Sequence, residues 1–145
     1  MNALIIPVYK NQDCIPDLLN AVMQINISMQ NDMTAVFVVD GSPDNSYSVL
    51  EKLLPDSGFK SKLIAHSRNF GSFAAIRTGL LSVEADKYAV MAADLQEPPE
   101  LIIDFFKELN NKVVDIVFGL RDSRKDPLFS KLFSILFWGF YRHFI

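Results

Sequence analysis

Asp94 and Gln96 are the two residues whose types and spacing most clearly favour chemistry. They follow a run of small and apolar residues, and the segment 87–91 predicts a buried strand. They precede Pro98-Pro99, a pair that fits only an extended turn or the first turn of a helix. Asp94 therefore falls at the C-terminal end of a strand, where open α/β sheets bind ligands. A carboxylate and an amide oxygen at this spacing can face one hard cation, Mg²⁺ or Mn²⁺, with a diphosphate completing its shell. The alternative is that Asp94 only caps the following helix.

Short apolar runs alternate with amphipathic helical patterns along the chain. The apolar runs predict strands at 4–6, 35–39, 62–65, 87–91 and 113–118, and helical spacing predicts a helix after each of the first four. The first helix should have Asp13 as N-cap and Pro16 in its first turn, and the second should run through Val49 and Leu53. The expected apolar faces of the first, third and fourth helices are Ile15, Leu18, Leu19 and Val22; Phe73, Ile76 and Leu80; and Ile102, Phe105, Phe106 and Leu109.

Continuous apolar strands, each followed by a helix, predict a doubly wound α/β fold, with a mostly parallel sheet and helices on both faces. The chain has 145 residues, 50% of them hydrophobic, which fits one globular domain. Its net charge of −3 argues against a nucleic-acid partner. The single cysteine, Cys14, excludes a disulfide within this chain. No Gly-x-Gly-x-x-Gly or Gly-Lys-Ser/Thr motif follows a predicted strand, which disfavours dinucleotide oxidoreductases and P-loop hydrolases.

Polar residues gather where each predicted strand ends. Because the C-terminal ends of parallel strands meet at one edge of a sheet, we expect these groups to converge there. Together they offer an aromatic face, short hydrogen-bonding groups, a metal ligand and guanidinium groups, which are the parts needed to bind a base, a ribose, a diphosphate and its counterion. The clusters are Pro7-Val8-Tyr9, Asp40-Gly41-Ser42, Arg68-Asn69, Asp94-Leu95-Gln96 and Arg121.

The same segments resemble, in content and order, the motifs of family 2 glycosyltransferases. Within that family the chain is most similar to the polyprenyl-phosphate glycosyltransferases, the dolichol-phosphate mannose synthase-like group, from about Leu4 to Lys131. The resemblance implies a GT-A type, Rossmann-like fold. The matching segments are Ile5-Ile6-Pro7-Val8-Tyr9, Val38-Val39-Asp40-Gly41-Ser42-Pro43-Asp44, Asn69-Phe70-Gly71 with Ala75 and Gly79, and the run from Ala92 to Glu100.

The resemblance also implies a role for each matching residue. A helix N-terminus under the nucleotide would suit its anionic groups. The simpler interpretation of these positions is that they form strand-ending turns. The implied substrate-binding residues are Pro7 and Tyr9 at the base, Asp40 and Ser42 beside base and ribose, and Asn69 and Gly71 under the nucleotide.

Asp94 with Gln96 would, by the same resemblance, hold the metal that bridges the donor's diphosphate. Arg121 and Arg124 match a segment near the acceptor and donor phosphates, where planar guanidinium groups bind oxygens well. Asp94 and the two arginines are therefore the expected catalytic residues. The arginines could equally belong to a solvated charged loop. His66, alone at a strand end, we expect to be structural.

Three positions depart from the family pattern. Val39 stands where the family has an acid before Asp40, and Ala92 stands where the first acid of an Asp-x-Asp precedes Asp94. Lys10-Asn11 stands where Asn-Glu is common. A single carboxylate can still hold Mg²⁺, because that ion keeps several waters and takes oxygens from the substrate's phosphates. A catalytically impaired nucleotide-sugar-binding module stays open as an alternative.

The expected reaction is inverting transfer of one sugar from a nucleotide sugar to a polyprenyl phosphate. The acceptor phosphate, with a second pKa near 6, is largely anionic at pH 7, so it needs less help from a general base than a hydroxyl does. This suits a site without an obvious catalytic base. A nucleotidyltransferase of similar fold is the nearer enzymatic alternative. A response-regulator domain is disfavoured, because it would need a phosphoacceptor Asp beside an acidic pair and a lysine on the last strand, and the run from Asp94 to Pro99 offers no such set.

Residues 128–145 favour contact with a membrane surface. Aromatic and aliphatic side chains form a broad apolar face opposite Lys131 and Arg142, which suits an interfacial helix better than a membrane span. The alternative is a last helix packed on the sheet or on another subunit, so a homo-oligomer stays open. We expect a nucleotide-sugar-binding domain at 1–126 and an amphipathic juxtamembrane helix at 127–145, in a truncated chain. The resemblance implies that the full-length form is anchored at the cytoplasmic face of a membrane.

Overall fold

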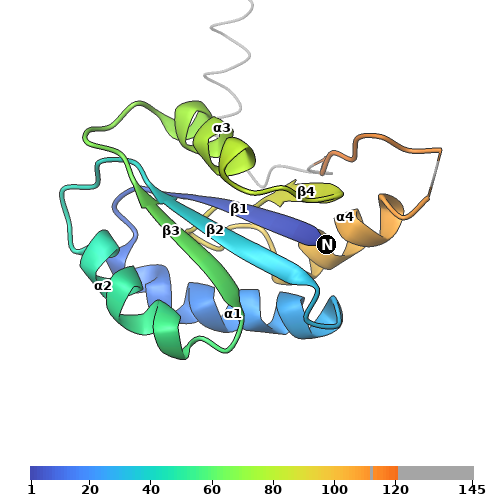
Figure 1. The fold of residues 1–145 in the computed structure, drawn as a ribbon, viewed down its shortest axis with the longest axis horizontal. Coiled ribbons are helices and arrows are strands. Elements are labelled where there is room, and N and C mark those ends of the chain that lie inside the picture. Colours follow the sequence, from blue (N-terminus) through green and yellow to red (C-terminus); the bar gives the residue numbers. More distant parts are fainter. Residues whose placement is uncertain (112, 121–145) are drawn as a thin grey trace, which may run out of the picture.

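The computed structural model describes residues 1–111 and 113–120. Within these residues, parallel strands alternate with helices (Figure 1). The strands are β1 (Asn2–Val8), β2 (Met33–Val39), β3 (Lys60–Ala65) and β4 (Lys87–Val90). The helices are α1 (Ile15–Ser28), α2 (Ser46–Leu53), α3 (Ser72–Ser82) and α4 (Pro99–Glu108), with short 3₁₀ turns η1 (Gln12–Cys14) and η2 (Leu54–Asp56).

The sheet has the strand order β3-β2-β1-β4, and every adjacent pair is parallel. The predicted α/β fold is confirmed, and the predicted strands at 4–6, 35–39 and 62–65 lie within β1, β2 and β3. The predicted strand at 87–91 overlaps β4, which ends at Val90, but it is not the buried strand expected, because Ala89 is the one buried residue of β4. The chain builds outward from β1 to β3 and then returns to the other side of β1 to form β4. Strand order therefore reverses between β1 and β4, and the crevice at their C-terminal ends is where open α/β sheets bind ligands.

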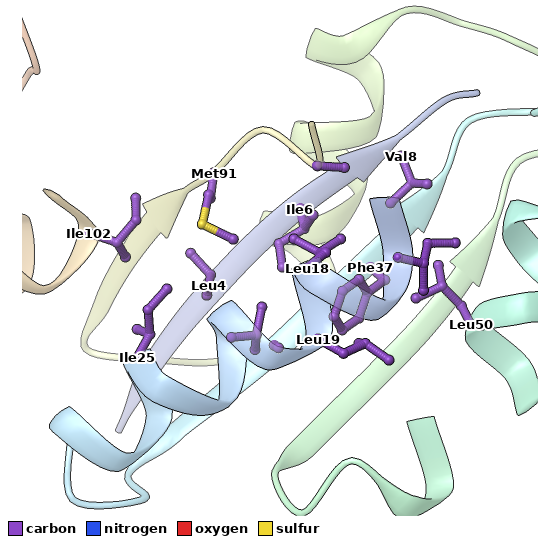
Figure 2. Packing of buried hydrophobic residues seen from close by; sticks show 14 of the residues in the cluster. Leu4, Ile6, Val8, Leu18, Leu19, Ile25, Phe37, Leu50, Met91 and Ile102 are labelled. Atoms are coloured by element: carbon purple, nitrogen blue, oxygen red, sulfur yellow. The ribbon is translucent and has the colours of Figure 1, made fainter. Parts of the chain in front are cut away.

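Helices cover both faces of the sheet: α1, α2 and α4 lie on one side and α3 on the other (Figure 1). Successive residues of β1 point to opposite faces, so Leu4 and Ile6 join the larger core while Ala3 and Ile5 join the smaller one. Figure 2 shows the larger core between the sheet and α1. Its fully buried members include Leu4, Ile6, Val8, Ile15, Leu18, Val22, Ile25, Phe37, Leu50 and Phe106.

The face of α3 that packs on the sheet differs from the predicted one. The buried residues are Ala75 and Gly79, whereas Phe73 is 87% exposed and Leu80 also faces outward. The prediction is wrong because the helix lies too close to the sheet for large side chains. A Cβ on Gly79 would lie 2.4 Å from Cγ2 of Ile5, so only small residues fit this contact.

Two further predictions are wrong. Residues 113–118 form no strand, and Val113, Ile116 and Phe118 are exposed. An apolar run becomes a strand only if a neighbour completes its hydrogen-bond ladder, and this run has no such partner among the described residues. Asp13 is not the N-cap of α1, because it lies inside η1 and the cap is Cys14, without a side-chain hydrogen bond. Pro16 does lie in the first turn, as predicted.

None of the helices formed by residues 1–111 and 113–120 combines the length and apolar character needed to cross a bilayer. Residues 127–145, for which we predict a juxtamembrane helix, lie outside the described part of the chain.

Candidate functional site

An open cleft of about 310 Å³ lies at the C-terminal edge of the sheet, at the reversal between β1 and β4. The loops after all four strands contribute to it. It brings together Tyr9, Asp40 and Asp94, which are far apart in the sequence. Four of the five predicted polar clusters thus contribute a residue to the cleft, and the fifth, Arg121, lies outside the described residues. The lining residues are Pro7, Val8, Tyr9, Asn11, Asp40, Asn69, Ser72, Ala92, Ala93 and Asp94.

The end of β1 supplies the aromatic wall of the cleft. Tyr9 is 41% exposed directly after the strand, and its N–H donates to Oδ1 of Asn11 at 3.0 Å. Lys10 turns the chain with φ of 58°, and its ammonium lies 5.3 Å from the centre of the Tyr9 ring. Tyr9 stays exposed beside this cation, and a planar base could stack on its ring.

Asp40 is a buried carboxylate at the end of β2. Its Oδ1 accepts the N–H of Phe70 at 2.9 Å and lies 2.7 Å from Nδ1 of His66, while its Oδ2 accepts the N–H of Gly71 at 2.7 Å. Burial alone would raise the pKa of Asp40, but these hydrogen bonds outweigh it and hold the pKa below its usual value. Asp40 is therefore ionised at neutral pH and ties β2 to the turn before α3.

Gly41 and Gly71 allow that turn to lie against the end of β2. Gly41 has φ of +57°, and a Cβ there would lie 2.2 Å from the carbonyl carbon of Arg68. Gly71 has φ of +93° and is the N-cap of α3, and its N–H is shared between Asp40 and Oδ1 of Asn69. Asn69 lines the cleft, whereas Gly71 contributes to it only through the turn.

Ser42 does not line the cleft. Its hydroxyl donates to Oδ1 of Asp44 at 2.6 Å and accepts the N–H of Lys10 at 2.8 Å. Burial would raise the pKa of Asp44, but hydrogen bonds from Ser42, Ser46 and Gln12 prevail and lower the pKa to about 2. This network joins the loops after β1 and β2, and so it braces Tyr9 from below the cleft.

Asp94 is an exposed carboxylate on the rim of the cleft. The N–H of Gln96 approaches its Oδ1 at 3.3 Å across a bend in which Leu95 has φ of 54°. Helix α4 begins only at Pro99 and has no side-chain cap, so the alternative that Asp94 caps this helix is wrong. Gln96 lines a neighbouring cleft of about 690 Å³, which meets the first one at Ala92.

The described residues contain no group of three or more His, Cys, Asp or Glu side chains arranged to hold a metal ion. Asp94 nevertheless fits a Mg²⁺ or Mn²⁺ ion bound mainly through substrate phosphates and water, because its carboxylate is exposed and, within residues 1–111 and 113–120, accepts one long hydrogen bond. Ala92, at the position of the family's missing acid, lines the cleft itself. The departure therefore removes a carboxylate from this cleft.

Asn11 and Ser72 line the cleft without having been predicted to bind anything. Their places could have suggested it, since Asn11 follows Tyr9 by two residues and Ser72 is the first residue of a helix that starts at the cleft. Arg121 and Arg124 lie outside the described residues. His66, expected to be structural, lies behind Asp40 and is not part of the lining.

An open parallel sheet with a polar cleft at its reversal point is the architecture of nucleotide-binding α/β proteins. The family model for glycosyl transferase family 2 matches residues 3–144. The chain belongs to this family.

Curated relatives of the chain act on lipid phosphates, by their names. It is 32% identical over 137 residues to an undecaprenyl-phosphate 4-deoxy-4-formamido-L-arabinose transferase of Edwardsiella ictaluri, covering 94% of this chain and 42% of the relative. It is 28% identical over 127 residues to a dodecaprenyl-phosphate galacturonate synthase of Rhizobium johnstonii, covering 88% of this chain and 38% of the relative. The chain thus spans well under half the length of these relatives.

Solved structures support the GT-A fold. A mannosyltransferase from Pyrobaculum calidifontis, solved with GDP-Man and Mn²⁺, superposes with a TM-score of 0.69 at 18% identity, over 78% of this chain and 33% of that one. TarS from S. aureus, residues 1–349, superposes with a TM-score of 0.65 at 20% identity, over 87% of this chain and 38% of that one. At these identities the likeness defines the fold alone.

Proposed function

We propose that the protein transfers a sugar from a nucleotide sugar to a polyprenyl phosphate by an inverting, metal-dependent reaction, and that the described domain binds the donor. The observation that carries the proposal is the single cleft that joins Tyr9, Asp40, Asn69 and Asp94 at the reversal of the sheet. The names of the curated relatives support a lipid-phosphate acceptor.

Each wall of the cleft matches one part of a nucleotide sugar. The exposed Tyr9 ring suits a base, and Pro7 lies beside it in the lining. One lone pair of Asp40 Oδ2 remains available for a donor group of the base or ribose, because this oxygen accepts only the Gly71 N–H from the described residues. Asn69 adds an amide in the turn before α3. Ser42 and Gly71 act by holding these loops together.

Asp94 is the residue that we propose to hold the metal, with Gln96 as a second ligand if its side chain turns from the neighbouring cleft. A divalent ion bound there would neutralise charge on the departing diphosphate. Asp94 would thus contribute to catalysis by holding the ion that stabilises the charge on the leaving group.

The proposed chemistry is one displacement. An oxygen of the acceptor phosphate attacks the anomeric carbon, the bond from that carbon to the diphosphate oxygen breaks, and the nucleoside diphosphate leaves with the electron pair. No proton needs to be removed from the attacking oxygen, because the phosphate is largely ionised at neutral pH. The protein's part is to align the two substrates, with the arginines Arg121 and Arg124 proposed at the phosphates.

For residues 128–145 we propose contact with the cytoplasmic surface of a membrane, which would bring the cleft to its lipid acceptor. Liposome flotation of residues 1–145, compared with residues 1–126, tests this. We expect flotation to depend on residues 127–145, and unchanged flotation after their deletion would rule the proposal out.

The donor site is tested by calorimetry on the full-length protein with UDP-, GDP- and dTDP-sugars in the presence of Mn²⁺. We compare wild type with Asp94→Ala and with Asp104→Ala, a control that removes an exposed acid paired with Lys107 on α4. One donor should bind wild type and the control alike, and Asp94→Ala should weaken it roughly tenfold or more. Equal affinity in Asp94→Ala and wild type would remove Asp94 from the site.

A transfer assay with a polyprenyl phosphate separates the alternatives. Sugar transfer supports the proposal. Donor binding without transfer by the full-length protein would instead identify an impaired binding module, as the loss of an acid at Ala92 allows. Release of pyrophosphate from a nucleoside triphosphate would identify a nucleotidyltransferase.

A further inference from the structure

His66 is an imidazole held by three neighbours at the end of β3. Its Nδ1 lies 2.7 Å from Oδ1 of Asp40, and its Nε2 lies 2.9 Å from Oγ1 of Thr78 on α3. The ring also meets Phe70 edge-on, with centroids 5.5 Å apart. The His66 side chain is only 13% exposed and does not line the donor cleft. It therefore connects β3, the end of β2 and α3 from behind the cleft.

Both hydrogen bonds of this imidazole survive a change in its charge. Because Asp40 is ionised, Nδ1 carries a proton and donates to Oδ1. A neutral ring accepts at Nε2 from the Thr78 hydroxyl, and a protonated ring donates to the same oxygen, since a hydroxyl can do either. His66 thus bridges Asp40 and Thr78 of α3 through its two ring nitrogens.

Through Asp40 the bridge reaches the backbone of the turn before α3. The two oxygens of Asp40 accept the N–H groups of Phe70 and Gly71. Without an imidazole at position 66, Oδ1 keeps the Phe70 N–H but loses its other partner. Losing a hydrogen bond to a buried charge is costly, and it leaves the carboxylate held only by the backbone of the turn. Asn69 precedes these two amides and lines the cleft, so the orientation of Asp40 sets the shape of that wall.

We propose that His66 is a positioning residue for donor binding: it locks the carboxylate of Asp40 so that the turn 69–71 presents Asn69 to the cleft. This inference rests on the proposed function, because its ligand is the nucleotide sugar. His66 itself contacts neither donor nor metal and acts through Asp40.

Substitutions in the full-length protein separate this bridge from simple packing. His66→Asn keeps an N–H near the position of Nδ1 and can still donate to Asp40, whereas His66→Leu occupies similar space without a hydrogen bond. Thr78→Val removes the second anchor, and Thr78→Ser keeps the hydroxyl. Amide hydrogen exchange reports the order of Phe70 and Gly71 without any ligand. Calorimetry reports the affinity for the nucleotide sugar that binds wild type.

We expect His66→Leu to exchange the Phe70 and Gly71 amides about tenfold faster and to bind the donor about tenfold more weakly, the loss expected for one hydrogen bond to a charged group. His66→Asn and Thr78→Ser should keep both the amide exchange rates and the donor affinity within about twofold of wild type. Thr78→Val should give values between those of wild type and His66→Leu. A lower melting temperature with unchanged donor affinity in His66→Leu would make the residue merely structural and overturn the proposal. Unchanged amide exchange would overturn it as well.

The wild-type protein distinguishes failure of this inference from failure of the proposed function. If wild type binds no nucleotide sugar, the proposed function is wrong and the inference falls with it. If wild type binds one and His66→Leu binds it equally well, only the inference is wrong.

Discussion

Gly41→Ala is the substitution for which we predict the largest damage to the cleft. Gly41 has φ of +57°, and a Cβ there would lie 2.2 Å from the carbonyl carbon of Arg68 and 2.4 Å from the nitrogen of Asn69. Ordinary contact begins near 3.4 Å, so the turn must retreat by about 1.2 Å. A shift of that size breaks the hydrogen bonds that this turn makes to Asp40, at 2.9 and 2.7 Å.

The cost has two parts. A positive φ costs an alanine about 1–2 kcal/mol, and overpacking adds about 1–3 kcal/mol, so the free energy of unfolding should fall by about 2–5 kcal/mol. Gly58→Ala is the matched control, because Gly58 has φ of +75° but its Cβ would meet only the flexible end of Met23, at 2.5 Å. That substitution should cost about 1–2 kcal/mol.

Denaturant titration followed by circular dichroism measures the stability of both variants, and calorimetry measures their donor affinity. We expect Gly41→Ala to be the less stable variant and to lose donor binding, and Gly58→Ala to keep it. Equal destabilisation of the two variants would refute the reasoning, because it would mean that the two loops do not approach each other as closely as the structure has them.

Two further predictions concern the carboxylate of Asp44 and the buried face of α3. The pKa of Asp44 is lowered from 3.8 to about 2, so its stabilisation is present above about pH 4 and is lost as the pH falls toward 2. Asp44→Asn should therefore lower the free energy of unfolding by about 1–2 kcal/mol at pH 7, with a gap to wild type that narrows on acidification; a constant gap from pH 5 to pH 2 would contradict this. On α3, Phe73→Ser should change the free energy of unfolding by less than about 0.5 kcal/mol, whereas Ala75→Leu should cost about 1–3 kcal/mol. If thermal melts showed that Phe73→Ser destabilises the protein more than Ala75→Leu does, the helix face predicted from the sequence would be the buried one.

The strands and most helix faces could be predicted because their cause is local. The run 35–39 is apolar over its whole length and buried throughout, and a parallel sheet covered on both faces requires this of an inner strand. The spacing of Ile15, Leu18 and Val22 likewise reports the one face of α1 that is buried. The convergence at the cleft followed from a topological rule, since the C-terminal ends of parallel strands share an edge.

The failures have non-local causes. Whether 113–118 becomes a strand depends on a partner elsewhere in the chain, and apolar content does not report that partner. Which face of α3 packs inward depends on how closely the helix approaches Ile5, and this distance selects Gly79 over the larger Phe73.

The amino-acid sequence by itself determined the α/β architecture, the place of the cleft and most of the residues on its walls, because hydrophobic period and strand-end chemistry are properties of short segments. Only the tertiary structure decided what those residues do to one another. It turned Asp40 inward to His66 and the turn before α3, brought the hydroxyl of Ser42 to the N–H of Lys10, and left Asp94 on the open rim. The physical reason is that a side chain's hydrogen-bond partners are set by loops from distant parts of the chain, whose separation in space no local pattern records.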